Sequence, residues 1–440
     1  MKQGILILFS PLNEARRSQV ERICSLHADV VLLSEPPASD ALPGWAGGLF
    51  KEVLTGDRND LPDFLTKIRN YSDRSNLPVI GVISLTETGV YFCARLAQAL
   101  DLRFPSPELV VRARDKSLMR DIFQAHGLPT VPHGTACCVD EGLSVARRIG
   151  YPVVIKPLLA GGSVFIRRVE SDGELSEVFD GYMQGGIQRV ANDPLVRMTV
   201  GADASPRILI EKLIGGKTKF ETSLPLPVGE VSIEGCVVDG SVHVLGFHDK
   251  PLPANGPHYE EVLWSTPTRL SPEWQEELRD LARRTLASIG LEYGIFHLET
   301  RTTDEGPVIL EVAARMGGGP IYRSIRESSG IDMIEIMYRI ATRQEVGDEL
   351  LRPSRKIPVM TFGFFAPEGE LLSIQGLEEV RRHPNVIEAA IYEYPGTYIH
   401  RAPRSDHCTV HVMVRADSHA EAEDIGRWAE ETIKFESQAK

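Results

Sequence analysis

Two glutamates and one arginine in the second half of the chain have types and spacing that suit a metal ion and phosphate. Glu299 and Glu311 each follow an apolar run, and Arg315 comes shortly after the second glutamate. Carboxylates in an apolar setting repel each other unless a cation lies between them, and Mg²⁺ prefers such oxygen ligands. A guanidinium adds a planar fork of donors for phosphate oxygens. These residues therefore predict a metal and nucleotide site, although two solvated strand ends explain them equally well.

The residues around the two glutamates predict a β-hairpin. Strands are expected at 294–299 and 308–312, joined by a turn at 303–307 that is rich in Asp, Gly and Pro. Glu299 and Glu311 can face each other across such a hairpin, where like charges destabilise the sheet unless something compensates them.

Two other stretches indicate that an anion or a base binds nearby. Lys156 ends an apolar strand predicted at 153–156, and a buried ammonium is costly unless it is paired. The turn at 161–163, Gly-Gly-Ser, can lay backbone amides against phosphates, although a plain hairpin turn is the more frequent explanation. A second strand, 207–210, runs into Glu211-Lys212-Leu213, where we expect unpaired backbone groups that an adenine edge can meet.

The composition limits the class of protein. With 440 residues, 42% hydrophobic and 25% charged, the chain is typical of a soluble globular protein of two to four domains. A formal net charge of -13 argues against a general nucleic-acid binder. No apolar run approaches the roughly 20 residues of a membrane span, and the apolar start at 4–9 is better explained as a buried strand than as a signal peptide. Six scattered cysteines without zinc spacing indicate a reducing cytoplasm.

The N-terminal part, 1–105, alternates strand-like and helical segments and predicts a doubly wound α/β domain with a parallel sheet. Strands are expected at 5–9, 30–33 and 78–83, with a helix at 14–26. Glu87 lies where a strand ends and a helix begins, the usual place for a ligand in such sheets. A helix cap explains Glu87 equally well.

Taken in order, these pieces resemble the ATP-grasp superfamily over most of the chain. The matching residues are Asp115-Lys116 before a helix, Val154-Ile155-Lys156-Pro157 before a glycine loop, Ile210-Glu211-Lys212-Leu213, Glu299, and Glu311-Val312-Ala313-Ala314-Arg315. The resemblance implies a multi-lobe α/β and α+β fold. Its parts would be the N-terminal domain (1–105), an ATP-grasp core (106–350) with a lid at about 130–210, and a C-terminal α+β module (351–440).

The resemblance also implies a role for each matching residue. Lys116 and Lys156 would hold ATP phosphates, and Ser163 would belong to a mobile loop that covers them. Adenine would be bound by Glu211 and the backbone of Lys212 and Leu213, with Leu310 against its face. Glu299 and Glu311 would bind Mg²⁺ or Mn²⁺, and Arg315 with Lys156 would assist the transfer of the phosphoryl group. Two positions depart from the family pattern. Ala313 replaces an asparagine that usually completes the metal site, and Lys219 stands where a ribose-binding glutamate is common.

Within the superfamily the chain is most similar to carboxylate-amine ligases, a group that includes L-amino acid (dipeptide) ligases. The supporting features are Gly317-Gly318-Gly319, the segment His248-Asp249-Lys250-Pro251 with Glu260-Glu261 and Pro267 after it, and a C-terminal module with strands at 359–365 and 410–414 and helices at 377–382 and 419–433. The resemblance implies that a carboxylate is activated as an acyl phosphate and joined to an amine. Small-molecule acid and amine substrates and a homodimer are expected, without nucleic acid or membrane.

Five residues are candidates for contact with substrate. Glu87 is one. Lys250 either contacts a substrate carboxylate or is a solvated loop lysine, which we prefer. His297 shares a strand face with Glu299 or is a satisfied core histidine. Gly318 and Gly319 either leave room for a bulky acyl substrate or mark a tight turn.

Two other functions remain open on sequence alone. One is a carboxylase of the biotin carboxylase or purine type that activates bicarbonate, although a biotin-carrier segment is lacking. The other is a non-enzymatic ATP-binding protein of the same fold, against which the complete set of lysines, glutamates and Arg315 argues.

Overall fold

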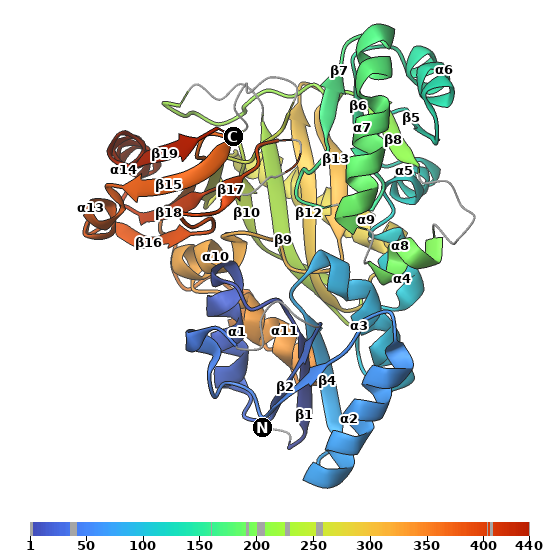
Figure 1. Ribbon diagram of the computed structural model, residues 1–440, viewed down its shortest axis with the longest axis vertical. Coiled ribbons are helices and arrows are strands. Elements are labelled where there is room, and N and C mark those ends of the chain that lie inside the picture. Colours follow the sequence, from blue (N-terminus) through green and yellow to red (C-terminus); the bar gives the residue numbers. More distant parts are fainter. Residues whose placement is uncertain are drawn as a thin grey trace.

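The structure is a computed structural model that describes residues 3–35, 42–159, 161–190, 193–199, 207–224, 229–251, 258–402, 404 and 408–439. The chain forms four parts: an N-terminal α/β domain, a central sheet with its helices, a lid and a C-terminal module (Figure 1). Within these ranges no helix is both long and apolar enough to cross a bilayer. All six cysteines are free thiols.

The N-terminal domain has the parallel sheet that the alternating pattern predicts, in the order β3-β2-β1-β4. Its elements are β1 (Ile5–Phe9), α1 (Glu14–Leu26), β2 (Val30–Ser34), the 3-10 turn η1 (Gly44–Ala46), β3 (Glu52–Thr55), α2 (Leu61–Ser75), β4 (Val79–Ser84) and α3 (Glu87–Ala99). Every residue of β1 is buried because helices cover both faces of the sheet. The predicted doubly wound arrangement is confirmed, with β3 and α2 as elements that the pattern did not reveal.

One helix that covers this sheet comes from much later in the chain. After α10 (Ile321–Ser329), α11 (Met333–Ala341) packs against α1 and β4. Its apolar residues share one buried cluster with Leu6, Ile83 and others of the N-terminal domain. The N-terminal domain is therefore fixed to the chain that follows Arg315, so that α1 and α3 reach the site.

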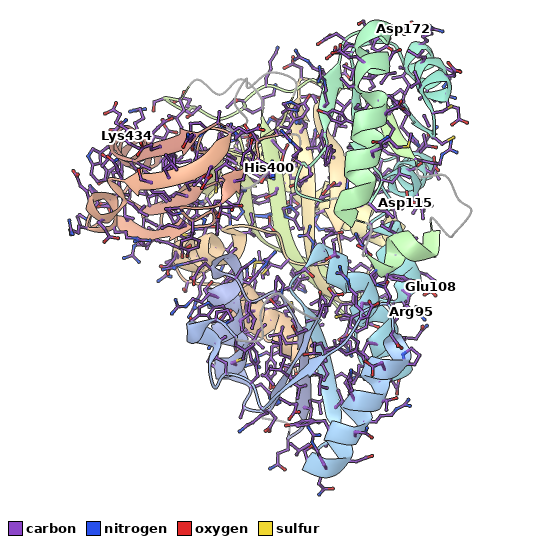
Figure 2. All side chains as sticks on the ribbon, viewed as in Figure 1. Arg95, Glu108, Asp115, Asp172, His400 and Lys434 are labelled. Atoms are coloured by element: carbon purple, nitrogen blue, oxygen red, sulfur yellow. The ribbon has the colours of Figure 1, made fainter. Side chains whose placement is uncertain are left out.

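The lid is a small antiparallel sheet, β5-β8-β6-β7, under two helices. It is entered through α4 (Pro107–Arg112) and α5 (Lys116–Ala125), and it contains β5 (His133–Ala136), α6 (Val139–Ile149), β6 (Val153–Pro157), β7 (Arg167–Val169), α7 (Asp172–Val190), α8 (Pro194–Thr199) and β8 (Ile208–Lys212). Asp115, which is labelled in Figure 2, lies at the start of α5. Its side chain caps the helix by accepting from the backbone N–H groups of Ser117 and Leu118, at 2.9 and 3.0 Å. This cap places Lys116 in the first turn, beside the site.

The central sheet has eight strands in the order β13-β12-β9-β10-β11-β14-β18-β16. The strands of the core are β9 (Glu230–Val238), β10 (Ser241–Asp249), β11 (Leu263–Thr266), β12 (Gly294–Thr303) and β13 (Gly306–Ala313), and α9 (Pro272–Ile289) packs against β10. The predicted hairpin is confirmed, with longer strands and a shorter turn than expected. Because β12 pairs with β9 on its other side, the two glutamates are held by three adjacent strands.

The C-terminal module continues this sheet because β14 pairs with β11 of the core. It contains α12 (Asp348–Leu351), β14 (Val359–Phe364), β15 (Gly369–Gln375), α13 (Leu377–Arg381), β16 (Val386–Ile391), β17 (Tyr398–Ile399), β18 (Val410–Arg415), α14 (His419–Thr432) and β19 (Lys434–Gln438). A second small sheet, β17-β15-β19, completes the module. The predicted strands β14 and β18 and helices α13 and α14 are confirmed, whereas the exact domain boundaries stay predictions.

Candidate functional site

A cavity of about 620 Å³ lies where the four parts meet. The predicted site residues that line it are Glu87, Lys116, Lys156, Ser163, Glu211, Leu213, Lys250, His297, Glu299, Leu310, Glu311, Arg315, Gly318 and Gly319. Lys212 is the one predicted residue that does not line the described cavity. Predicted residues from seven separate segments of the chain therefore meet in one cavity.

The two glutamates of the hairpin are direct cross-strand partners, Glu299 on β12 and Glu311 on β13. A register shift follows Glu299, which locally bends the pairing. Each carboxylate faces a different cation: the Lys116 ammonium lies 3.0 Å from Glu311, and the Lys250 ammonium lies 2.6 Å from Glu299. The repulsion expected between these side chains is therefore compensated within the protein by lysines.

Lys250 lies at the centre of a carboxylate cluster. Its ammonium contacts Glu230 at 2.9 Å and Glu299 at 2.6 Å, and it also contacts Glu261. The preferred interpretation of a solvated loop lysine is wrong, because Lys250 follows β10 directly and is only 1% exposed. Burial acts against its charge, but the three carboxylates raise its pKa well above the ordinary value.

The oxygens of Glu230, Glu261 and Glu299 lie within 4.8 Å of one another, close enough to share a metal ion. This donor set fits Mg²⁺ or Mn²⁺, which prefer carboxylate oxygens. Burial raises the pKa of Glu261, and the charges of Glu299 and Glu230 raise it further, whereas Lys250 lowers it. Three carboxylates around one ammonium leave an excess of negative charge. The cluster is therefore suited to a cation of more than one charge.

His297 alternates with Glu299 on β12 and faces the same side. Its ring nitrogens lie 2.8 Å from Glu234 and 3.0 Å from Glu299. Burial opposes protonation, yet these two carboxylates raise the pKa of His297 to about 10, so the ring is an imidazolium at neutral pH. His297 therefore orients Glu299 rather than serving as a free base.

At the other side of the cavity, one carboxylate lies between two cations. Glu211 contacts the Lys156 ammonium at 2.5 Å and the Arg120 guanidinium at 3.0 Å. All three side chains are buried. Burial favours protonation of Glu211, but the charges of Arg120 and Lys156 outweigh it and lower its pKa to about 2. This region therefore carries a net positive charge.

The hinge after β8 differs from the expectation of unpaired backbone donors. The N–H of Lys212 donates to Pro132 O at 2.9 Å, and the N–H of Leu213 donates to Pro152 O at the longer distance of 3.3 Å. The Lys212 ammonium turns away from the cavity and donates to the carbonyl oxygens of Gly150 and Tyr151. These donors were expected to be free because strand pairing with the lid could not be seen in the sequence.

Glu87 is the first residue of α3 and joins two arginines. Its carboxylate contacts Arg315 and, at 2.9 Å, Arg114. Thr86 caps the helix, so the cap interpretation of Glu87 is wrong. Burial acts to raise the pKa of Glu87, but the charges of Arg315 and Arg114 outweigh burial and lower the pKa to about 2. Arg315 is thereby held by a carboxylate from the N-terminal domain.

The glycines around the cavity have separate roles. A Cβ on Gly161 would lie 3.5 Å from the Glu87 side chain, so the loop covers Glu87 closely. A Cβ on Gly317 would lie 2.9 Å from His297 Nδ1, so this position needs glycine. Gly318 and Gly319 have open space instead, and Gly319 has a φ of +54°, so the turn and the room for substrate occur together.

Sequence reasoning missed part of this site. Glu230 and Arg120 belong to no recognisable motif. Arg114 only precedes the Asp115-Lys116 motif, and Glu261 belongs to a segment that supported the family resemblance without a role of its own. Three side chains from distant segments, Arg16, Tyr392 and His411, also line the cavity, and no local signal marks them. Lys219, one of the two departures from the family pattern, pairs with Asp304 at 2.8 Å outside the cavity lining.

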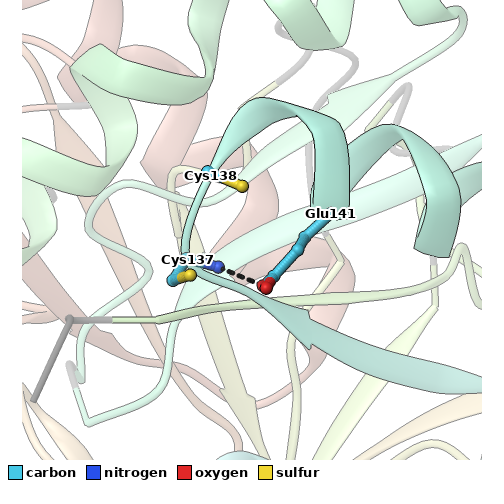
Figure 3. A group of neighbouring side chains, drawn as sticks. All are labelled: Cys137, Cys138 and Glu141. Carbon is cyan, nitrogen blue, oxygen red and sulfur yellow. Dashed lines mark hydrogen bonds between the residues drawn. The ribbon is translucent and has the colours of Figure 1, made fainter.

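A second group of side chains with metal-binding atoms lies on the lid, at Cys137, Cys138 and Glu141 (Figure 3). Glu141 already accepts from the Cys137 N–H at 2.9 Å and pairs with Arg207 at 3.3 Å. A hydrogen bond to Glu141 raises the pKa of the Cys137 thiol, which disfavours the thiolate that a metal needs. Of the two groups found among the described residues, the carboxylates in the cavity are therefore the better candidate for a metal site.

Known families match two parts of the chain. The ATP-grasp domain matches residues 149–323, and L-amino acid ligase C-terminal domain 2 matches residues 363–438. An uncharacterized protein of Sinorhizobium fredii, y4rH, is 26% identical over 434 residues, covering 98% of this chain and 82% of that protein.

Two further relatives have named activities. Alanine–anticapsin ligase of Bacillus subtilis is 25% identical over 265 residues, covering 59% of this chain and 54% of that ligase, so the chain spans about half of that relative. The crystal structure of an L-amino acid ligase from Bacillus licheniformis has a TM-score of 0.82 at 22% identity and covers 99% of both chains. At this identity the second likeness shows the fold alone.

The fold, the cavity and the domain match agree: the chain contains an ATP-grasp domain over residues 149–323 and has the overall fold of an L-amino acid ligase. The resemblance inferred from the sequence is confirmed. More particularly, residues 363–438 match L-amino acid ligase C-terminal domain 2, so the chain combines the two domains in the order that the sequence motifs indicated.

Proposed function

We propose that the protein joins a carboxylic acid to an amine at the expense of ATP, and that both substrates are amino acids or similar acids. The observation that carries this proposal is the convergence of Lys116, Lys156, Glu299, Glu311 and Arg315 on one cavity. A binding protein without catalysis has little use for Arg315, which reaches the cavity from beside the metal ligands and is fixed by Glu87.

The nucleotide would lie between the lid and the central sheet. Lys156 and Lys116 would contact its phosphates, Glu211 and the backbone at Lys212 and Leu213 would meet its adenine, and Leu310 would pack on the ring. The long Leu213 N–H bond of 3.3 Å is the one that adenine would replace. The Gly161-Gly162-Ser163 loop would close over the phosphates and exclude water.

Glu299 and Glu311, joined by Glu230 and Glu261, would hold Mg²⁺. When bound, the ion supplies positive charge beside the phosphates, as in other phosphoryl-transfer sites. Ala313 offers no ligand at the usual asparagine position, and the nearby Glu230 and Glu261 provide carboxylates in its place. In the structure described above, Lys250 offsets part of the negative charge of this cluster.

The chemistry then follows from charge. The acid substrate attacks the γ-phosphate of ATP and becomes an acyl phosphate, and the amine displaces phosphate to form an amide. Lys116, Lys156 and Arg315 stabilise negative charge on the moving phosphoryl group, which is the main contribution of proteins to such transfers. Arg315 is placed for this role because Glu87 orients its guanidinium.

ADP release measured with single L-amino acids, with pairs of L-amino acids and with bicarbonate tests the proposal. We expect release that requires a pair, together with a dipeptide detected by mass spectrometry. Release with bicarbonate alone would show a carboxylase instead, and no release under any condition would show a binding protein. The homodimer expected from similar ligases stays a prediction, which light scattering after gel filtration would check.

A further inference from the structure

Arg16, on α1 of the N-terminal domain, has an unusual charge environment. Of the lysines and arginines that line the cavity, it alone has no carboxylate within ion-pair distance among the described residues. The others pair with Glu35, Glu87, Glu211, Glu230, Glu261, Glu299 or Glu311. The one side-chain bond recorded for its guanidinium is to Gln19 Oε1, at 3.1 Å. Most of its five N–H donors therefore remain for a ligand.

The guanidinium is also costly as it stands. Burial and the neighbouring charge of Arg315 lower the pKa of Arg16 to about 10, so it keeps its charge at neutral pH without a counterion. A cation kept in this state at the wall of a substrate cavity is suited to an anionic group of the substrate. The proposed ATP phosphates have other cations, Lys116 and Lys156, which pair with Glu311 and Glu211.

Next to Arg16 the C-terminal module contributes a chain of three polar side chains. Tyr392 and Glu388 each form a short hydrogen bond to the ring of His411, at Nδ1 and Nε2 respectively. Burial opposes the charge of Glu388, but His411 and Arg323 lower its pKa, so it is a carboxylate and can only accept. In the neutral form of the His411 ring, Nε2 carries the proton that Glu388 accepts, Nδ1 accepts, and the Tyr392 hydroxyl is the donor.

This direction leaves the Tyr392 oxygen free to accept a hydrogen bond from the cavity, which it lines. Burial raises the pKa of Tyr392 well above its ordinary value, so the group is a neutral phenol. Arg16 and Tyr392 interact electrostatically, and α1 lies against β16, which directly precedes Tyr392. A cation and a hydrogen-bond acceptor therefore lie near each other in the lining of the cavity.

We propose that Arg16 and Tyr392 bind the amine substrate in this part of the cavity. Arg16 binds the carboxylate of this amino acid, and Tyr392 accepts a hydrogen bond from its ammonium group. The inference rests on the proposed ligase function, in which both substrates are amino acids or similar acids, and assigns the residues that hold the second of them. It also gives the C-terminal module a direct part in the site.

The proton transfers balance as follows. The ammonium gives one proton to the Tyr392 oxygen while the Tyr392 hydroxyl proton moves to His411 Nδ1, and Glu388 stabilises the resulting imidazolium. The free amine attacks the carbonyl carbon of the acyl phosphate, the new C–N bond forms, and the C–O bond to phosphate breaks. The second proton of the nitrogen leaves with the phosphate, and His411 returns its proton to solvent.

Amino acid amides provide a sharp test, because an amide has no carboxylate and can serve only as the amine substrate. For each acid substrate that reacts, ADP release and the amide product are measured with an L-amino acid as the amine substrate and with the C-terminal amide of that amino acid. L-alanine and L-alaninamide are one such pair. We expect the wild type to use the amino acid with a KM roughly 10- to 100-fold lower than the amide, the range for one charge-assisted contact. In Arg16→Gln that difference should vanish because only the amino acid loses affinity.

Matched variants separate the role of Arg16 from folding. Arg16→Lys keeps the charge and should restore part of the preference for the amino acid. Arg17→Gln removes the neighbouring arginine of α1, which pairs at the surface with Glu14 and Glu21, and should match the wild type. The KM for ATP should stay unchanged in all three variants. An equal loss for amino acid and amide in Arg16→Gln, or a rise in the KM for ATP, would overturn the assignment.

Tyr392→Phe tests the proton path. We expect kcat to fall at least tenfold, with a smaller rise in the KM for the amine substrate because one hydrogen bond to its ammonium group is lost. ADP from the first turnover should still form because activation of the acid precedes the reaction of the amine. A rise in the KM for the amine substrate with an unchanged kcat would contradict a role of Tyr392 in proton transfer. If no pair of L-amino acids releases ADP with the wild type, the ligase function itself fails; if pairs react but amide and acid are used alike, this inference alone fails.

Discussion

Two regions of the cavity hold the same kinds of side chain in opposite proportions. Near the hinge, two cations, Arg120 and Lys156, surround the single carboxylate of Glu211. On the central sheet, a single ammonium, that of Lys250, lies among three carboxylates. The first region has an excess of positive charge and the second an excess of negative charge.

The difference shows how a protein can prepare for a charged substrate before it binds. Each region keeps one opposite charge, which limits the cost of burying the others. The charge that remains is positive where we place the phosphates and negative where we place Mg²⁺. A nucleotide with its metal ion would complete both regions at once.

The largest effect is expected from the acidic region. Glu311→Ala removes a carboxylate that we assign to the metal and an ion-pair partner of Lys116, so turnover should fall below detection in an ADP-release assay. Glu305→Ala, in the exposed turn of the same hairpin, is the control and should behave as the wild type. Near-normal ADP release from Glu311→Ala would refute the metal site.

Arg315 lies between the two regions and should affect the reaction without affecting nucleotide binding. Arg315→Ala is expected to lower turnover by roughly two to three decades, the scale for losing one preorganised charge-stabilising donor. Its affinity for ATP, measured by calorimetric titration, should stay close to that of the wild type. A parallel loss of ATP affinity would count against the assigned role.

The basic region should respond in binding. Lys156→Met removes a charge that we assign to the phosphates, and ATP should bind roughly 10- to 100-fold more weakly, the equivalent of one charge-assisted hydrogen bond. Lys212→Met, a few residues from the same strand junction, should bind ATP normally, because its ammonium points to the carbonyls of Gly150 and Tyr151. Equal losses in the two variants would remove the distinction between them.

The smallest effect concerns stability and pH. The pKa of Glu211 is lowered from 4.5 to about 2 in the folded protein, so its ionisation stabilises the fold above pH 4.5 and this contribution is lost as the pH falls towards 2. Its size is about 3 kcal/mol at most. Urea unfolding of the wild type and of Glu211→Gln should therefore show a difference that narrows below pH 4.5. A difference that stays constant down to pH 2.5 would contradict the ion pairs at Glu211.

Most of the elements and the main residues of the cavity could be predicted from sequence because their signals are local. The alternation at 5–9, 14–26 and 30–33 predicted a parallel sheet, and the spacing of Glu299 and Glu311 predicted a hairpin with facing carboxylates. In both cases a few neighbouring residues determine the periodicity, the turn or the cross-strand contact. The ordered family motifs then linked segments that no local pattern connects.

The parts that could not be predicted depend on long-range contacts. Lys250 looked like a loop residue because Glu230 and Glu261, which neutralise it, come from other segments. The pairing of the hinge backbone depends on residues of the lid that are far away in sequence. Likewise, nothing near Arg16 shows that Tyr392 and His411 lie beside it, since they are separated by most of the chain.

The hydrogen-bonded junction between β11 and β14 has a consequence for how such ligases can be rebuilt. A recombinant that ends before β14 would leave the edge of β11 open, and an exposed strand edge invites association with other chains. Exchange of the C-terminal region between related enzymes should therefore preserve the facing residues of both strands, from Leu263 to Thr266 and from Val359 to Phe362. A splice chosen from linker composition alone would separate two halves of a single sheet.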